Sequence, residues 1–240
     1  MKFSIFLCWL CVFVLFSCSD IKEQSIGYSD IKIAGAMKNV MWQGELSGII
    51  QLDTISDKNG LFGLGPLSYL KGELLINDGK VFVSKVLSDS TMLVEETLDV
   101  SAPFFVYGNV TEWKESKLPS SVKDIKSLEN HINQLTKLEK RPFVFKLKGK
   151  VDTAQIHIQN LPEGTKVSSP KEAHQGQTNY KLTKETVEII GFFSTEHQGI
   201  FTHHDSFVHM HLITQDHSKM GHLDKVLFSE GNVKLLLPLK

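Results

Sequence analysis

The chain has 240 residues, of which 41% are hydrophobic and 22% are charged. This composition is typical of a globular protein and excludes a wholly disordered chain. The formal net charge is −1, from 26 basic and 27 acidic side chains, so a nucleic-acid-binding protein with a broad basic face is not expected. Arg141 is the only arginine, so a site that requires a guanidinium group has one candidate.

The N-terminus is predicted to direct export. Lys2 precedes an apolar run from Phe3 to Phe16, which is shorter than the roughly 20 residues of a membrane-spanning helix and is typical of a signal peptide over residues 1–17. Ser17-Cys18 resembles the end of a bacterial lipobox; an ordinary secretory signal is the alternative. We expect Cys18 to be lipidated and residues 18–30 to form a tether. The protein would then lie in the bacterial cell envelope (periplasm or outer membrane), held at the membrane by this lipid alone.

Residues 31–240 are predicted to form one domain, whose N-terminal half extends to about residue 118. Strand patterns dominate this half. Leu74-Leu75-Ile76 and Val81-Phe82-Val83 flank Asn77-Asp78-Gly79, a sequence typical of a β-hairpin turn with positive φ. In Phe62-Gly63-Leu64-Gly65-Pro66, the glycines exclude a regular helix and indicate close backbone approach.

A helix is predicted from about Ser121 to Lys140, between the two halves. Pro119 precedes it, and Ser120 or Ser121 can cap its first turn. Apolar residues recur every three or four positions, which places them on one face of a packing helix. They are Val122, Ile125, Leu128, Ile132, Leu135 and Leu138.

The C-terminal half, from about residue 141, again reads as strands. We expect a strand at 143–145, a turn at Lys148-Gly149, a strand at 154–158 and a long loop over 162–178. Further strands are expected at 187–193, 207–213, 226–228 and 233–237, with a turn at 230–232 between the last two. The fold class is therefore α+β, with two sheet-rich halves of mixed or antiparallel strands and a long helix between them.

Histidines crowd into the C-terminal end of the chain, where seven of the ten lie within the last 44 residues. The predicted domain has no cysteine, so a metal site must use histidine, aspartate or glutamate. His209 and His211 share one face of a predicted strand, about 6.6 Å apart at the standard rise. His222 lies where a return hairpin would bring a third imidazole. Three neutral imidazoles with an open position suit a catalytic Zn²⁺ or a similar divalent ion.

The alternative for each of these histidines is a packed or surface residue without a ligand. The adjacent pair His203-His204 would point to opposite sides of an extended chain and is a weaker candidate. Asp205, Asp216 and His217 are assigned to the approaching loops.

The histidine spacing resembles a known family. His209-Met210-His211 followed by Gly221-His222-Leu223-Asp224 is similar to the zinc motif of the α-acetolactate decarboxylases. The resemblance covers roughly residues 40–235. Its further matches are Phe62-Gly63-Leu64-Gly65, Lys71-Gly72-Glu73-Leu74, Asp78-Gly79-Lys80, Pro103-Phe104 and Ile190-Gly191-Phe192.

The resemblance implies a two-part α+β fold, a zinc site near the second sheet, and the conversion of 2-acetolactate, a small-molecule keto acid, into acetoin and CO2. It also implies a role for Glu73, which matches a glutamate that lies at the metal in the family and would bind zinc or relay a proton. Without the resemblance, Glu73 reads as a solvent-facing strand residue. Homodimerisation is left open.

Two departures from the family set expectations for the active site. The family uses an arginine on a strand after the central helix, and His157 falls at about that position. Arg141 lies before the strand and is not expected to replace it. The sequence also ends 18 residues after His222, without the family tail that carries another active-site glutamate. The alternatives are therefore a non-catalytic metal- or ligand-binding envelope lipoprotein that retains the fold, and a structural envelope protein with incidental histidines.

Overall fold

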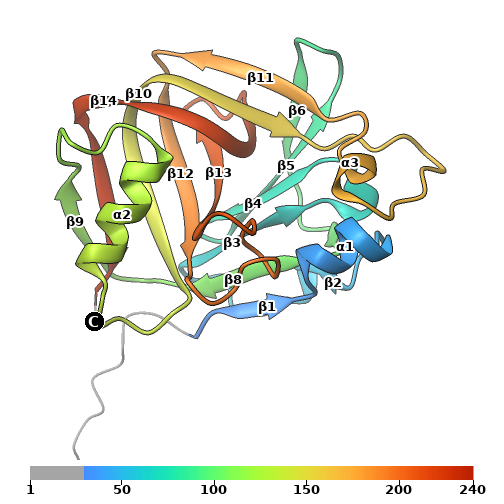
Figure 1. The fold of residues 1–240 in the computed structure, drawn as a ribbon, viewed down its shortest axis with the longest axis horizontal. Helices are drawn as coiled ribbons and strands as arrows, with labels where there is room; N and C mark the ends of the chain where they lie inside the picture. The colour runs from blue at the N-terminus through green and yellow to red at the C-terminus, as the bar shows by residue number, and fades with distance from the viewer. Residues whose placement is uncertain (1–29, 240) are drawn as a thin grey trace, which may run out of the picture.

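Antiparallel strands are the main regular structure of residues 30–239, which the computed structural model describes (Figure 1). The predicted signal peptide, Cys18 and the predicted tether as far as residue 29 lie outside these residues. The strands form two six-stranded sheets and a short ladder of β2 (Ile50–Gln51) with β7 (Ser101–Ala102). Helices are few and short. The expected α+β class, with two sheet-rich halves, is confirmed.

The first sheet comes from the N-terminal half and contains the predicted hairpin. At its turn, Asp78 and Gly79 have φ values of 53° and 81°, as the sequence predicts. A Cβ on Gly63 would lie 2.6 Å from Phe105 Cε1, so the close approach expected here is also confirmed. In spatial order, the strands are β1 (Lys32–Ala34), β8 (Phe105–Asn109), β3 (Leu61–Pro66), β4 (Glu73–Asn77), β5 (Lys80–Val86) and β6 (Met92–Glu96).

The second sheet closes on itself. Its order is β11 (Thr178–Thr183), β10 (Phe143–Ile158), β12 (Thr186–Phe193), β13 (Val208–Thr214), β14 (Met220–Pro238) and β9 (Trp113–Lys117). The long strand β10 also pairs with β14. Strands β10, β12, β13 and β14 therefore form a small closed barrel, on which β11 and β9 are further strands.

Strand alternation gives β13 two different environments. Val208, Met210 and Leu212 pack in the core that also contains the buried residues of α2 (Ile125–Leu135). Ile213 packs in the other core, between the two sheets, with residues of β3, β5 and β12. Since successive side chains point to opposite faces, His209 and His211 lie on the face that looks toward the first sheet.

The helix between the halves is shorter than predicted. α2 spans only Ile125–Leu135, and Asp124 rather than Ser120 or Ser121 caps it, through a capping box with Ser127. Leu138, assigned to the packed face, is 96% exposed. The apolar spacing continued past the end of the helix, where Thr136 has already left helical geometry.

Two predicted turns are wrong, because a strand continues through each position, with a bulge at the second. Gly149 lies inside β10, where β14 passes so close that a Cβ would be 1.9 Å from the Asn232 carbonyl oxygen. Gly149 therefore allows the two strands to pass close together and does not form a turn. Residues 229–232 form a bulge in β14, since the register moves from Val233 opposite Gly149 to Phe228 opposite Val151.

The predicted loop over 162–178 contains the short helix α3 (Pro170–Ala173) and ends at β11, which was not predicted. The available sequence signal for β11 was the alternation of Tyr180 and Leu182 with polar residues, which the structure matches by burying both side chains. The remaining short elements are α1 (Met37–Gln43) and two 3₁₀ turns, Leu52–Thr54 and Ser68–Leu70. Among residues 30–239, no helix has the length and apolar character needed to span a bilayer.

Candidate metal centre and active site

The hairpin of β13 and β14 brings the three predicted histidines together. His211 and His222 are direct partners in the ladder, and His209 lies two residues before His211 on the same face. His209 Nε2 is 3.1 Å from His222 Nδ1. One ring nitrogen from each of the three lies within 4.8 Å of the others, which is close enough to surround a single ion.

Burial keeps these imidazoles neutral. It lowers the pKa of His211 to about 3, and together with the neighbouring histidines it lowers the pKa values of His209 and His222 well below the ordinary value of 6.5. Within the described part of the chain, His209 Nδ1 and both ring nitrogens of His211 have no hydrogen-bond partner. Each such unpaired buried group costs about 1–3 kcal/mol. A divalent cation would satisfy one ring nitrogen of each histidine, so this donor set fits a metal site with an open position.

Glu73 faces the triad from the first sheet. It is 2% exposed, so a solvent-facing glutamate is the wrong interpretation. Its Oε2 lies 3.6 Å from His211 Nε2, and its Oε1 accepts a hydrogen bond from the Gln159 backbone amide at 3.2 Å. Burial raises the pKa of Glu73 well above 4.5, despite the opposing amide hydrogen bond, which favours a protonated carboxylic acid.

The backbone just before Glu73 is strained. Tyr69 and Leu70 have φ values of 61° and 51°, in the left-handed region that side chains other than glycine seldom adopt. Gly72 follows with φ 155°, where a Cβ would lie 2.4 Å from the Ser84 carbonyl oxygen. This tight segment starts β4 with Glu73 aimed at the second sheet. Such strain is found most often where a functional side chain must be held in place.

His157 lies beside Glu73 and His222. It is the direct partner of His222 between β10 and β14, and the two rings stack with centroids 4.6 Å apart. His157 Nε2 is 4.0 Å from Glu73 Oε1, and its Nδ1 is 2.8 Å from Asp224 Oδ1. The structure therefore brings all five predicted site residues of the domain into one cluster: Glu73, His157, His209, His211 and His222.

Two residues near the site, Gln159 and His203, were not predicted as site residues from the sequence. Gln159 contacts Glu73 through its amide, and His203, rated a weaker candidate, has its ring 5.4 Å from that of His222. His203 lies on the 194–207 loop, whose conformation strand spacing cannot predict, whereas His204 is exposed. Arg141 makes contacts of its own, donating hydrogen bonds to Thr195 and Asn133.

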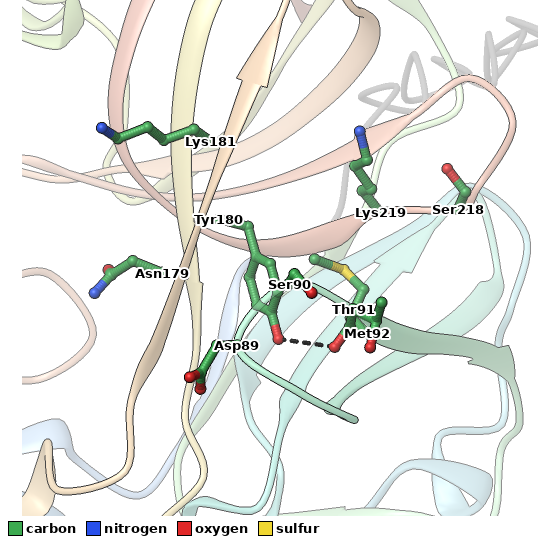
Figure 2. Close-up of a pocket in the computed structure, with 9 residues that line it drawn as sticks. All are labelled: Asp89, Ser90, Thr91, Met92, Asn179, Tyr180, Lys181, Ser218 and Lys219. Atoms are coloured by element: carbon green, nitrogen blue, oxygen red, sulfur yellow. Dashed lines mark hydrogen bonds between the residues drawn. The ribbon is translucent and has the colours of Figure 1, made fainter.

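A hollow of about 280 Å³ reaches the site beside α2, and its walls include His203, Asp205, His222 and Asp224. Its volume suits a small organic acid. A larger hollow of about 500 Å³ lies between β6 and β11, where Tyr180 donates a hydrogen bond to the Thr91 carbonyl (Figure 2). No histidine and no residue of the cluster lines the second hollow. The first hollow is therefore the candidate binding site.

Three buried imidazoles that could hold a metal ion, with a buried carboxyl group beside them, lie between two antiparallel sheets. The comparisons with known proteins agree. The sequence model of the α-acetolactate decarboxylases matches residues 35–237, so the chain belongs to the α-acetolactate decarboxylase family, as the motifs indicated. The family resemblance is thereby confirmed.

Relatives and solved structures extend this result. The α-acetolactate decarboxylase of Lactococcus lactis subsp. cremoris (strain MG1363) is 27% identical over 206 residues, covering 85% of this chain and 78% of the relative. That of L. lactis subsp. lactis (strain IL1403) is 26% identical over the same shares. The acetolactate decarboxylase structure from Bacillus subtilis subspecies spizizenii has a TM-score of 0.71 at 22% identity, covering 88% of this chain and 87% of that one. A Staphylococcus aureus protein of unknown function, similar to α-acetolactate decarboxylase, has a TM-score of 0.73 at 16% identity, with coverage of 88% and 86%. These structures share the fold.

Proposed function

We propose that the protein is a zinc-dependent decarboxylase that converts 2-acetolactate into acetoin and CO2. The observation that carries this proposal is the buried cluster of His209, His211 and His222 with the Glu73 carboxyl group 3.6 Å from His211, in a chain of the α-acetolactate decarboxylase family. A purely structural role does not explain three buried imidazoles, two of them with ring nitrogens unpaired among the described residues, that face a buried acid.

Each residue has a role that its surroundings favour. His209, His211 and His222 would hold the cation as neutral ligands, because burial has removed their protons at neutral pH. When bound, the cation supplies a Lewis acid for negative charge on the substrate oxygens. The substrate, with a hydroxyl group beside a ketone, offers two oxygen atoms to such a site.

Glu73 is the proposed proton donor. When the bond to the carboxylate carbon breaks, CO2 leaves and the remaining carbon must take up one proton, so each turnover consumes one proton. Burial raises the pKa of this carboxyl group, which favours the protonated form that can donate at this step. The Gln159 amide fixes its orientation, so that the proton is delivered to one face of the carbon.

The decisive experiment uses residues 19–240, purified with zinc and incubated with racemic 2-acetolactate. We expect acetoin to form above the spontaneous rate and a chelator to abolish this excess. A protein that holds about one zinc ion per chain but forms no acetoin would instead be a binding protein that kept the fold. Failure to hold zinc at all would contradict the assignment of the triad.

We also propose that the protein is exported and anchored by lipid at Cys18, which the apolar run followed by Ser17-Cys18 supports. Mass spectrometry of the mature protein from a membrane fraction would show a diacylglyceryl modification at Cys18. A Cys18→Ser variant found in the same membrane fraction would contradict the lipid anchor.

A further inference from the structure

The hydrogen bonds of His157 determine which of its ring nitrogens carries the hydrogen atom. Asp224 Oδ1 lies 2.8 Å from His157 Nδ1. An ionised carboxylate can only accept, so Nδ1 carries the hydrogen and donates it. In a neutral imidazole, the other nitrogen, Nε2, is then an acceptor. It is this accepting nitrogen that looks toward Glu73 and the inside of the site.

The side-chain amides of Gln159, Gln177 and Asn179 form a chain next to His157 Nε2 and support the same assignment. Gln177 Nε2 donates to Asn179 Oδ1 at 3.2 Å, so Gln177 turns its carbonyl oxygen toward Gln159. Gln159 Nε2 approaches that oxygen and His157 Nε2, each at 3.4 Å. Since each amide orients the next, Gln159 presents N–H groups to His157, and His157 Nε2 must accept.

The buried atoms without a hydrogen-bond partner around His157 are also acceptors. Gln159 is 4% exposed, and its Oε1 has no hydrogen-bond partner among the described residues. Asp224 Oδ2 is likewise buried and unpaired. The contact of Gln159 with His157 Nε2 is long, so a hydroxyl group at the usual O–H···N distance would make the stronger bond. Gln159 Oε1 and Asp224 Oδ2 therefore lack a donor, and His157 Nε2 has only the long contact with Gln159. A ligand hydroxyl group would give the Nε2 corner of the site a stronger donor.

We propose that Asp224 and Gln159 hold His157 as a hydrogen-bond acceptor, so that this corner of the site binds a substrate hydroxyl group and disfavours a carboxylate. The ligand class is an α-hydroxy ketone whose hydroxyl hydrogen points at His157 Nε2, with any carboxylate directed away from Asp224. The inference rests on the proposed function only in placing the ligand in the same site. An arginine here could only donate, so His157 has the opposite recognition chemistry.

The first test is spectroscopic and needs no turnover. In ¹⁵N-labelled full-length protein at pH 8, long-range ¹H–¹⁵N correlation spectra distinguish the two nitrogens of each histidine. We expect His157 to show a protonated Nδ1 and an unprotonated Nε2, with Asp224→Asn weakening this preference. A wild-type His157 that carries its hydrogen on Nε2 would overturn the proposal.

The second test measures recognition of the hydroxyl hydrogen. Binding of acetoin and of its methyl ether, 3-methoxy-2-butanone, to the zinc-loaded protein is measured by titration calorimetry. We expect His157→Phe to reduce the wild-type preference for acetoin about tenfold, the equivalent of one hydrogen bond of about 1.4 kcal/mol.

The matched control is His204→Phe, which alters an exposed histidine of the nearby loop and should keep the wild-type preference. An unchanged preference in folded His157→Phe would overturn the proposal. If His157→Phe does not fold, the spectra of the wild type and of Asp224→Asn still test the proposed tautomer of His157. Failure of the proposed decarboxylation would appear separately, as the absence of acetoin formation from acetolactate with the binding preference intact.

Discussion

Replacing His211 by alanine tests the metal site most directly. This side chain is fully buried, and neither of its ring nitrogens has a partner among the described residues. A cation that binds only the folded chain raises the free energy of unfolding by about 4.1 kcal/mol when its free concentration is 1,000 times Kd. For a domain of this size, each kcal/mol raises Tm by about 2–4 °C, so zinc should raise the wild-type Tm by about 8–16 °C.

His211→Ala leaves two of the three imidazoles. At the same free zinc concentration, we expect its Tm to rise by less than about 6 °C, because a lost ligand lowers affinity by more than the roughly 100-fold effect of a lost supporting contact. Differential scanning calorimetry of chelator-treated protein, with and without added zinc, measures both shifts. The control is His204→Ala, an exposed histidine on the nearby loop, which should keep the wild-type shift. An equal zinc-induced shift in His211→Ala would refute the triad as the zinc site.

Three further predictions concern the proton donor, a buried ion pair and a crossing of two strands. Glu73→Gln should keep zinc binding but lower kcat for acetoin formation about 100-fold or more, because a proton donor is lost; equal activity would exclude this role. Burial raises the pKa of Glu188, but hydrogen bonds from Lys146 and Asn77 outweigh it and lower the pKa to about 2. As the pH falls from about 4.5 to 2, the free energy of unfolding of the wild type should therefore decrease by roughly 2–3 kcal/mol, and that of Glu188→Gln should decrease less. Urea titrations at several pH values measure both decreases, and identical pH profiles would contradict this. Gly149→Ala should destabilise the protein by more than 3 kcal/mol or prevent folding, because its Cβ would clash with Asn232. The control Gly231→Ala, at φ 70° with no atom within 4 Å, should cost only about 1 kcal/mol. Similar denaturation midpoints for the two variants would disprove the close crossing.

The triad was predictable because it depends on local rules. Strand alternation places His209 and His211 on one face, and a hairpin places His222 opposite His211. Both rules act within about fifteen residues of chain. The hairpin at Asp78-Gly79 was predictable for the same reason, since its turn requires positive φ at positions where these residue types tolerate it.

Elements whose form depends on distant contacts were predicted less well. Gly149 carries the sequence signal of a turn, yet it lies within a strand because another strand crosses it at Asn232. The apolar periodicity of the helix extended to Leu138, although the packing that stabilises a helix ends earlier and leaves this residue in solvent.

The sequence by itself determined the strand-rich α+β class, the family and the three clustered imidazoles. Only the tertiary structure placed Glu73 and His157, which the resemblance had indicated as candidates, beside the triad. Glu73 comes from the other sheet, and its burial, which raises its pKa, exists only when the two sheets pack together. Likewise, the pairing of β10 with β14 sets His157 against His222 and Asp224 across more than sixty residues of sequence. Hydrogen bonds and desolvation act over a few ångströms of space, so a pattern along the chain cannot report them until the fold has brought these groups together.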